Sequence, residues 1–133
     1  MLRGRCARDG PRLELANEAP TYAEVVHDRE LATRYRTNAL ALGRPIPDLG
    51  PLADRFAGST DMGNVSQRIP SIHPTIGIES LPAVNHQPEF AAHCVTPAAD
   101  RALVDGAIAM AWTAIDVAAD ASLSARLRAR GAV

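Results

Sequence analysis

The sequence predicts an α/β fold in which long helices pack on a mixed sheet. Apolar residues recur at helical spacing over residues 21–42 and again over residues 97–120, whereas residues 12–15 and 75–79 alternate as strands do. With 133 residues, the chain can form one domain or part of a larger one. Because two short strands cannot make a complete sheet, we expect either a small mixed fold or further strands outside this sequence.

The first helix is expected over residues 21–42. Its apolar side chains fall mostly on one face, and charged side chains fill the other. Thr21 can serve as the N-cap, with Glu24 three residues later at the spacing of a capping box. Gly43 and Pro45 follow the last apolar residue, so we expect the helix to end there.

The middle of the chain is dominated by turns and one extended segment. Residues 44–51 are rich in proline and glycine, and residues 58–63 have the composition of a turn. In residues 75–79, Ile76 and Ile78 fall on one face of an alternating pattern, which predicts a strand.

A long second helix is expected to begin at Thr96-Pro97, where a capping hydroxyl precedes a proline at the first helical position. It should run to about Asp120 and be followed by a further helical piece that is basic toward its end. We expect a larger sheet to cover its apolar stripe, which is therefore exposed when the chain is alone. The stripe consists of Val104, Ala107, Ile108, Ala111, Trp112, Ile115 and Ala118.

Composition excludes several classes of partner. All fourteen basic residues are scattered arginines and the formal net charge is −1, so the basic footprint of a nucleic-acid binder is absent. Neither a secretory signal nor a run of about 20 apolar residues is visible. Cys6 and Cys94 lie far apart in the sequence and form no CxxC pair, and two free thiols are compatible with a reducing compartment. We therefore expect a cytoplasmic protein that binds neither nucleic acid nor membrane.

Three short motifs lie between residues 58 and 90. They read Gly58-Ser59-Thr60-Asp61, Ile69-Pro70-Ser71-Ile72-His73-Pro74 and Asn85-His86-Gln87-Pro88-Glu89-Phe90. In this order they resemble the C-terminal part of the catalytic domain of the M-twenty metallopeptidases, a family of zinc-dependent amidohydrolases of the p-aminobenzoyl-glutamate hydrolase, aminoacylase and carboxypeptidase G type. The resemblance implies a partial three-layer zinc-peptidase-like domain, incomplete in this chain. Residues 1–18 would be a remnant of the inserted lid (dimerisation) domain, and residues 19–133 the C-terminal part of the catalytic domain.

His86 is the main candidate metal ligand. Imidazole binds zinc well, and a ligand histidine is often held by a further oxygen acceptor. The resemblance implies that His86 is the family's C-terminal metal ligand. Glu89, one helical turn later, then has a structural role, either as that acceptor or as a cap of the local backbone. His27, on a helix rich in charge, is expected to be solvated.

The turn at residues 58–61 and His73 are candidates for substrate binding. By residue type alone, Asp61 fits an Asx turn in which the carboxylate bonds its own backbone. The resemblance implies that Ser59 and Thr60 contact the substrate while Asp61 holds the turn. It also implies that His73 lines the substrate pocket, as in the branch of p-aminobenzoyl-glutamate and β-alanyl-dipeptide hydrolases, although residue type alone fits a partly buried histidine at a strand end.

The resemblance implies hydrolysis of an amide bond in a small N-acyl amino acid or dipeptide by a homodimeric enzyme. Such an enzyme holds two divalent ions, zinc or in its place manganese or cobalt. The family's general base and other metal ligands have no counterpart here, so no catalytic residue is assigned and we expect the chain alone to be inactive. Two other interpretations stay open: a non-enzymatic truncated remnant, and a small helical interaction module that pairs with another helix through the Trp112 stripe.

Overall fold

The structure is a computed structural model that describes residues 21–47 and 60–131. They form five helices: α1 (Arg29–Ala41), α2 (Met62–Ser66), α3 (Pro88–His93), α4 (Pro97–Ala119) and α5 (Ala121–Gly131). These described residues contain no strand, only an isolated parallel bridge between His27 and Ser71. The helical half of the predicted α/β fold is therefore present, whereas the predicted mixed sheet is not seen in this part of the chain.

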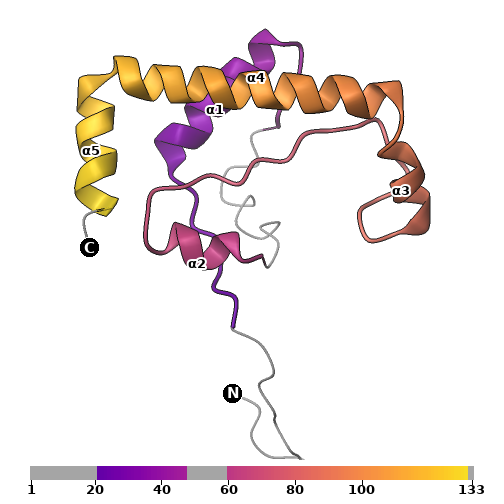
Figure 1. Ribbon diagram of the computed structural model, residues 1–133, viewed down its shortest axis with the longest axis horizontal. Helices are drawn as coiled ribbons and strands as arrows, with labels where there is room; N and C mark the ends of the chain where they lie inside the picture. Colours follow the sequence, from indigo (N-terminus) through magenta and orange to yellow (C-terminus); the bar gives the residue numbers. More distant parts are fainter. Residues whose placement is uncertain (1–20, 48–59, 132–133) are drawn as a thin grey trace, which may run out of the picture.

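The long helix α4 organises the described part of the molecule (Figure 1). It lies across α1, while α5 turns away from one of its ends and α3 lies near the other. Its start is the predicted one, because Thr96 Oγ1 accepts a hydrogen bond from the Ala99 N–H at 3.2 Å and Pro97 takes the first helical position. It ends at Ala119, so its predicted extent is confirmed.

Small side chains let α1 approach α4 closely. Ala39 of α1 and Ala109 of α4 are fully buried, and Tyr35 packs with them. Alanine at a helix crossing removes the bulk that would hold the two backbones apart. The partly buried side chains around this cluster are those of Leu42, Ile46 and Ile72.

Polar side chains fix the position of α1 on α4. Asn38 Nδ2 donates to Thr113 Oγ1 at 3.2 Å and to Asp116 Oδ2 at 2.9 Å. Just beyond α1, Arg44 Nε donates to Asp105 Oδ2 at 2.8 Å. The buried Thr113 hydroxyl donates to the Ala109 carbonyl of its own helix at 2.8 Å, so the bond from Asn38 adds a second partner. These pairs therefore favour packing through the α4 face that carries Thr113 and the two aspartates.

The start of α1 differs from the prediction. The helix begins at Arg29, and Asp28 is the N-cap, since its Oδ1 accepts a hydrogen bond from the Leu31 N–H at 3.2 Å. The predicted cap at Thr21 is therefore wrong. The end of the helix is as predicted, because Gly43 follows it with φ +74°, a left-handed conformation that glycine adopts without strain.

The segment before α1 is extended because α2 supplies its hydrogen bonds. The Ala23 N–H donates to Asn64 Oδ1 at 2.7 Å, and the Val26 N–H donates to Ser66 Oγ at 3.0 Å. Gly63 lies directly against the Ala23 carbonyl, where a Cβ atom would have no room. Partners about forty residues away thus override a local helix signal.

The strand predicted at residues 75–79 is wrong within the described part of the chain. The segment is not helical but pairs with no other strand among the described residues. Ile76 instead lies over Gly106 of α4, so the alternating pattern reflects packing against a helix. The other predicted strand, residues 12–15, and the predicted lid remnant, residues 1–18, lie outside the described residues.

The other face of α4 is apolar and exposed, as expected for its stripe. The most exposed large side chains on it are Leu103, Val104, Met110, Trp112 and Ile115. By length and composition α4 is also apolar enough to cross a bilayer, which was not expected from the sequence. One such helix among the described residues is weak evidence for a membrane span, because core helices of soluble proteins pass the same test.

The helix α5 confirms the further helical piece that the sequence predicts. Asp120 caps it, because Oδ1 accepts hydrogen bonds from the N–H groups of Ser122 (3.1 Å) and Leu123 (3.0 Å). Arg34 of α1 donates to the second oxygen at 2.8 Å. The hydrogen bond from the Leu123 N–H, then that from the Ser122 hydroxyl at 2.7 Å, and less strongly that from Arg34 hold the pKa of Asp120 below its ordinary value. Leu123 is buried, so α5 is anchored at its first turn.

Candidate functional site

The structure brings two of the predicted substrate-contact residues together. Thr60 Oγ1 lies 3.4 Å from His73 Nδ1. The His73 N–H donates to Nδ1 of His27 at 3.4 Å, next to the bridge that joins His27 to Ser71. Two polar contacts thus connect Thr60 to His73 and His73 to His27. The third predicted contact, Ser59, lies outside the described residues.

Asp61 is exposed at the start of α2. Its carboxylate makes no capping hydrogen bond to that helix. Backbone bonds close the turn instead: the Gly63 N–H donates to the Thr60 carbonyl at 3.0 Å, and the Asn64 N–H donates to the Asp61 carbonyl at 3.1 Å. The structural role assigned to the Asp61 side chain stays a prediction.

His86 lies in the turn before α3, with its side chain exposed and a φ of +68°. Left-handed backbone is uncommon for residues other than glycine, and residues held in it cluster at functional sites. Glu89 is exposed in the first turn of α3 and bonds to no described residue through its side chain. The roles of both residues stay predictions.

No three His, Cys, Asp or Glu side chains within residues 21–47 and 60–131 are arranged to hold a metal ion. His86 therefore does not belong to a three-ligand metal cluster formed by the described residues. By themselves, the described residues do not fit a two-ion centre.

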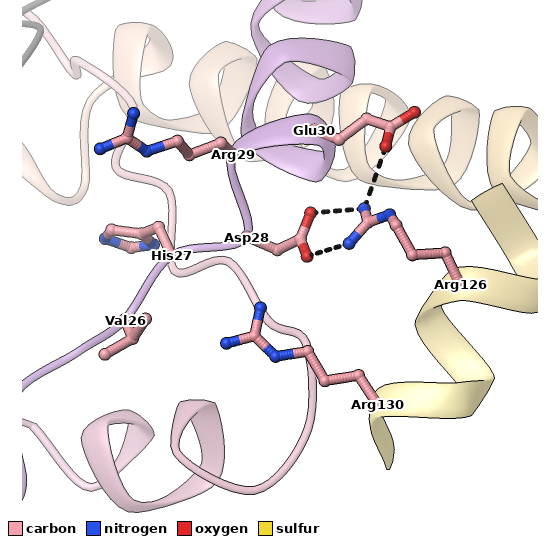
Figure 2. A pocket seen from close by; sticks show the side chains of 7 residues that line it. All are labelled: Val26, His27, Asp28, Arg29, Glu30, Arg126 and Arg130. Atoms are coloured by element: carbon pink, nitrogen blue, oxygen red, sulfur yellow. Dashed lines mark hydrogen bonds and ion pairs between the residues drawn. The ribbon is translucent and has the colours of Figure 1, made fainter. Parts of the chain in front are cut away.

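A second polar site, which no sequence motif indicated, lies where α5 meets the start of α1 (Figure 2). The Asp28 side chain is 3% exposed and receives two hydrogen bonds from Arg126, at 2.8 and 2.9 Å. Glu30 adds an ion pair with Arg126 at 3.1 Å. The hydrogen bonds from Arg126 hold the pKa of Asp28 below its ordinary value, although burial acts in the opposite direction. Since 98 residues separate Asp28 from Arg126, no local sequence signal could have paired them.

The Asp28–Arg126 ion pair lines an open hollow of about 500 Å³. The lining residues are Val26, His27, Asp28, Arg29, Glu30, Arg126 and Arg130 (Figure 2). His27, which the sequence placed in solvent, is half-buried and connects this hollow to the Thr60–His73 pair. The hollow is referred to below as the junction groove.

Over most of its length, the chain is similar to a metallopeptidase of the dipeptidase class. The particular relatives are Xaa-Arg dipeptidase of Mus musculus and Xaa-Arg dipeptidase of Homo sapiens, each 31% identical over 116 residues. The matches cover 87% of this chain but 27% and 26% of the two relatives, so the chain spans about a quarter of their length. This distant similarity points to the same M-twenty family as the sequence motifs. No family model and no solved structure matches the chain.

Proposed function

We propose that the chain is the C-terminal part of a metal-dependent amidohydrolase that cleaves the amide bond of a dipeptide or a small N-acyl amino acid. The observation that carries the proposal is the similarity to Xaa-Arg dipeptidase, which extends over 87% of the chain. The name of the relatives makes a dipeptide with a C-terminal arginine the first substrate to test. The complete enzyme would be a cytoplasmic homodimer with two divalent ions, zinc or alternatively manganese or cobalt.

In this proposal, His86 contributes one metal ligand, while Thr60 and His73 contact the substrate. His86 is exposed in the turn before α3, so its imidazole is accessible to a metal held by other parts of the enzyme. The 3.4 Å contact between Thr60 and His73 supports a shared pocket, since it gathers a hydroxyl and an exposed imidazole. The described residues group no three metal-binding side chains, so further ligands and the general base would have to come from other parts of the complete enzyme.

A chimera tests this function. This chain replaces the matching segment of the mouse Xaa-Arg dipeptidase, and the hydrolysis of dipeptides ending in arginine is measured with and without added zinc. We expect metal-dependent hydrolysis, and we expect His73→Ala in the chimera to raise KM while leaving the metal content unchanged. A chimera that matches the parent enzyme in circular dichroism and elution volume but hydrolyses nothing would contradict the proposal.

A further inference from the structure

We propose that the junction groove is a binding site for a compact oxyanion, a phosphate or a carboxylate group. The side chains that carry this proposal are those of Arg29, Arg130 and His27, all of which line the groove. None of them is the proposed metal ligand or a proposed substrate contact, so the inference does not rest on the proposed function.

Two of the three arginines in the groove have no partner in the described part of the chain. Arg126 is committed to Asp28 and Glu30. Arg29 and Arg130, in contrast, make no side-chain hydrogen bond or ion pair with any described residue. Figure 2 shows the Arg29 side chain extending away above the His27–Asp28 segment and the Arg130 guanidinium below it, with the His27 ring between the two in height. The groove therefore holds two guanidinium groups that are free to bind a ligand.

The two carboxylates in the groove are both paired with Arg126, which offsets one of their two negative charges. Both oxygens of Asp28 are bonded to Arg126, and Oδ1 also accepts the Leu31 N–H. Glu30 contacts Arg126 at 3.1 Å and Arg34 at 3.9 Å. With three arginines against two carboxylates, the lining carries a net positive charge.

His27 adds a hydrogen-bond donor to this charge. Its Nδ1 accepts the His73 N–H, so the proton of the neutral imidazole lies on Nε2, and that nitrogen is a donor. Each guanidinium offers a planar fork of N–H groups that matches two oxygens of a carboxylate or phosphate. The open hollow of about 500 Å³ leaves ample room for such a group. The charge of the lining and the type of its donors thus favour an oxyanion.

The test is calorimetric titration of the 133-residue chain with inorganic phosphate and, separately, with succinate. Low ionic strength is required because salt screens exposed charges. The variants are Arg29→Gln and Arg130→Gln, and Arg128→Gln is the matched control, since it lies on α5 but outside the groove. We expect each groove variant to bind about tenfold more weakly, as loss of a charge-assisted contact predicts, and the control to stay within about twofold.

Each outcome decides the proposal. Binding of phosphate alone assigns a phosphate group, binding of succinate alone assigns a carboxylate, and binding of both assigns a general oxyanion site. The proposal is overturned if the unchanged chain binds neither probe, if the groove variants bind as well as the unchanged chain, or if Arg128→Gln weakens binding as much as they do. Circular dichroism checks each fold, and the exposed positions of Arg29 and Arg130 make unfolding by either change unexpected.

Discussion

Replacing Asp28 by alanine should destabilise the fold substantially, because this buried carboxylate joins two helices. It caps α1 through the Leu31 N–H and receives two hydrogen bonds from Arg126 of α5. The alanine variant removes both interactions. Asp28→Asn is the informative companion, because its amide oxygen can still cap α1 while its charge is lost.

The size of the effect follows from these contacts. Loss of the N-cap costs about 1 kcal/mol. The charge-assisted bonds to the buried Asp28 carboxylate add about 1.5 kcal/mol, the low end for such bonds, because solvent reaches the other side of the pair. The free energy of unfolding should therefore fall by about 2.5 kcal/mol in Asp28→Ala and by about 1.5 kcal/mol in Asp28→Asn. Urea unfolding followed by circular dichroism measures both.

The same contacts predict a dependence on pH. Arg126 lowers the pKa of Asp28 in the folded chain, so the stabilisation is complete above the unfolded-state pKa of about 3.9. As the pH falls below that value, the unfolded chain takes up the proton first, and the stabilisation is lost until the folded-state pKa is passed. The pKa of Asp120 is lowered as well, so Asp120 contributes a pH dependence of the same sign. The contribution of Asp28 is therefore the difference between the unchanged chain and Asp28→Asn in the slope of the unfolding free energy against pH.

Asp100→Ala is the control for this prediction. Asp100 is an exposed carboxylate in the first turn of α4 with no side-chain partner among the described residues. Its removal should change the free energy of unfolding by less than about 1 kcal/mol. If Asp28→Ala unfolds at the same urea concentration as the unchanged chain, or if the control loses as much stability, the reasoning about the ion pair is refuted.

Three further predictions concern other parts of the chain. Gly63→Ala should destabilise the fold by about 1–3 kcal/mol, because the added Cβ meets the Ala23 carbonyl. Gly77→Ala is the control and should change the stability by no more than about 0.5 kcal/mol, because there is open space around Gly77. Equal urea midpoints for the two variants would contradict this. Because of the exposed face of α4, the chain should bind a hydrophobic dye or self-associate in sedimentation. The double variant Leu103→Gln, Met110→Gln should reduce both effects. A compact monomer that binds no dye would be inconsistent with an uncovered face. The chain alone should hydrolyse no dipeptide, since its described part groups no three metal-binding side chains, and metal-dependent turnover that survives purification would disprove this.

The helix ends were predicted best where they depend on residues close together in the sequence, such as a capping residue or a terminating glycine. Thr96-Pro97 fixes the start of α4 through a bond to Ala99, three residues from the cap, and Gly43 ends α1 through its own backbone conformation. Such features depend on sequence distances of one turn and can be recognised without a structure.

Features set by distant partners could not be predicted. Thr21 has the spacing of a capping box, but hydrogen bonds from side chains of α2 keep the following segment extended. The N-cap is Asp28, which bonds to the Leu31 N–H and to Arg126. On α4 apolar residues occur on both faces, so periodicity alone could not show that the side carrying Ala109 and polar partners for α1 is the packed one. The junction groove was missed because its residues come from segments about a hundred positions apart.

The candidate site was predicted only in its residue types and order. The motifs placed Thr60 and His73 in one pocket, and the structure shows them in contact, but their roles stay predictions. A sequence cannot show which other residues reach a metal held by His86, because ligands that meet in space need not be near in the chain.

The most direct test of the account is the zinc content of the chimera that carries His86→Ala. If His86 is a metal ligand, the variant should lose about one ion per chain and most of its activity while keeping its fold, because a two-ion site needs both ions to stabilise charge and activate water. His93→Ala, on the neighbouring helix α3, is the control and should keep its metal and activity. Full metal occupancy with near-normal kcat in His86→Ala would contradict the assignment.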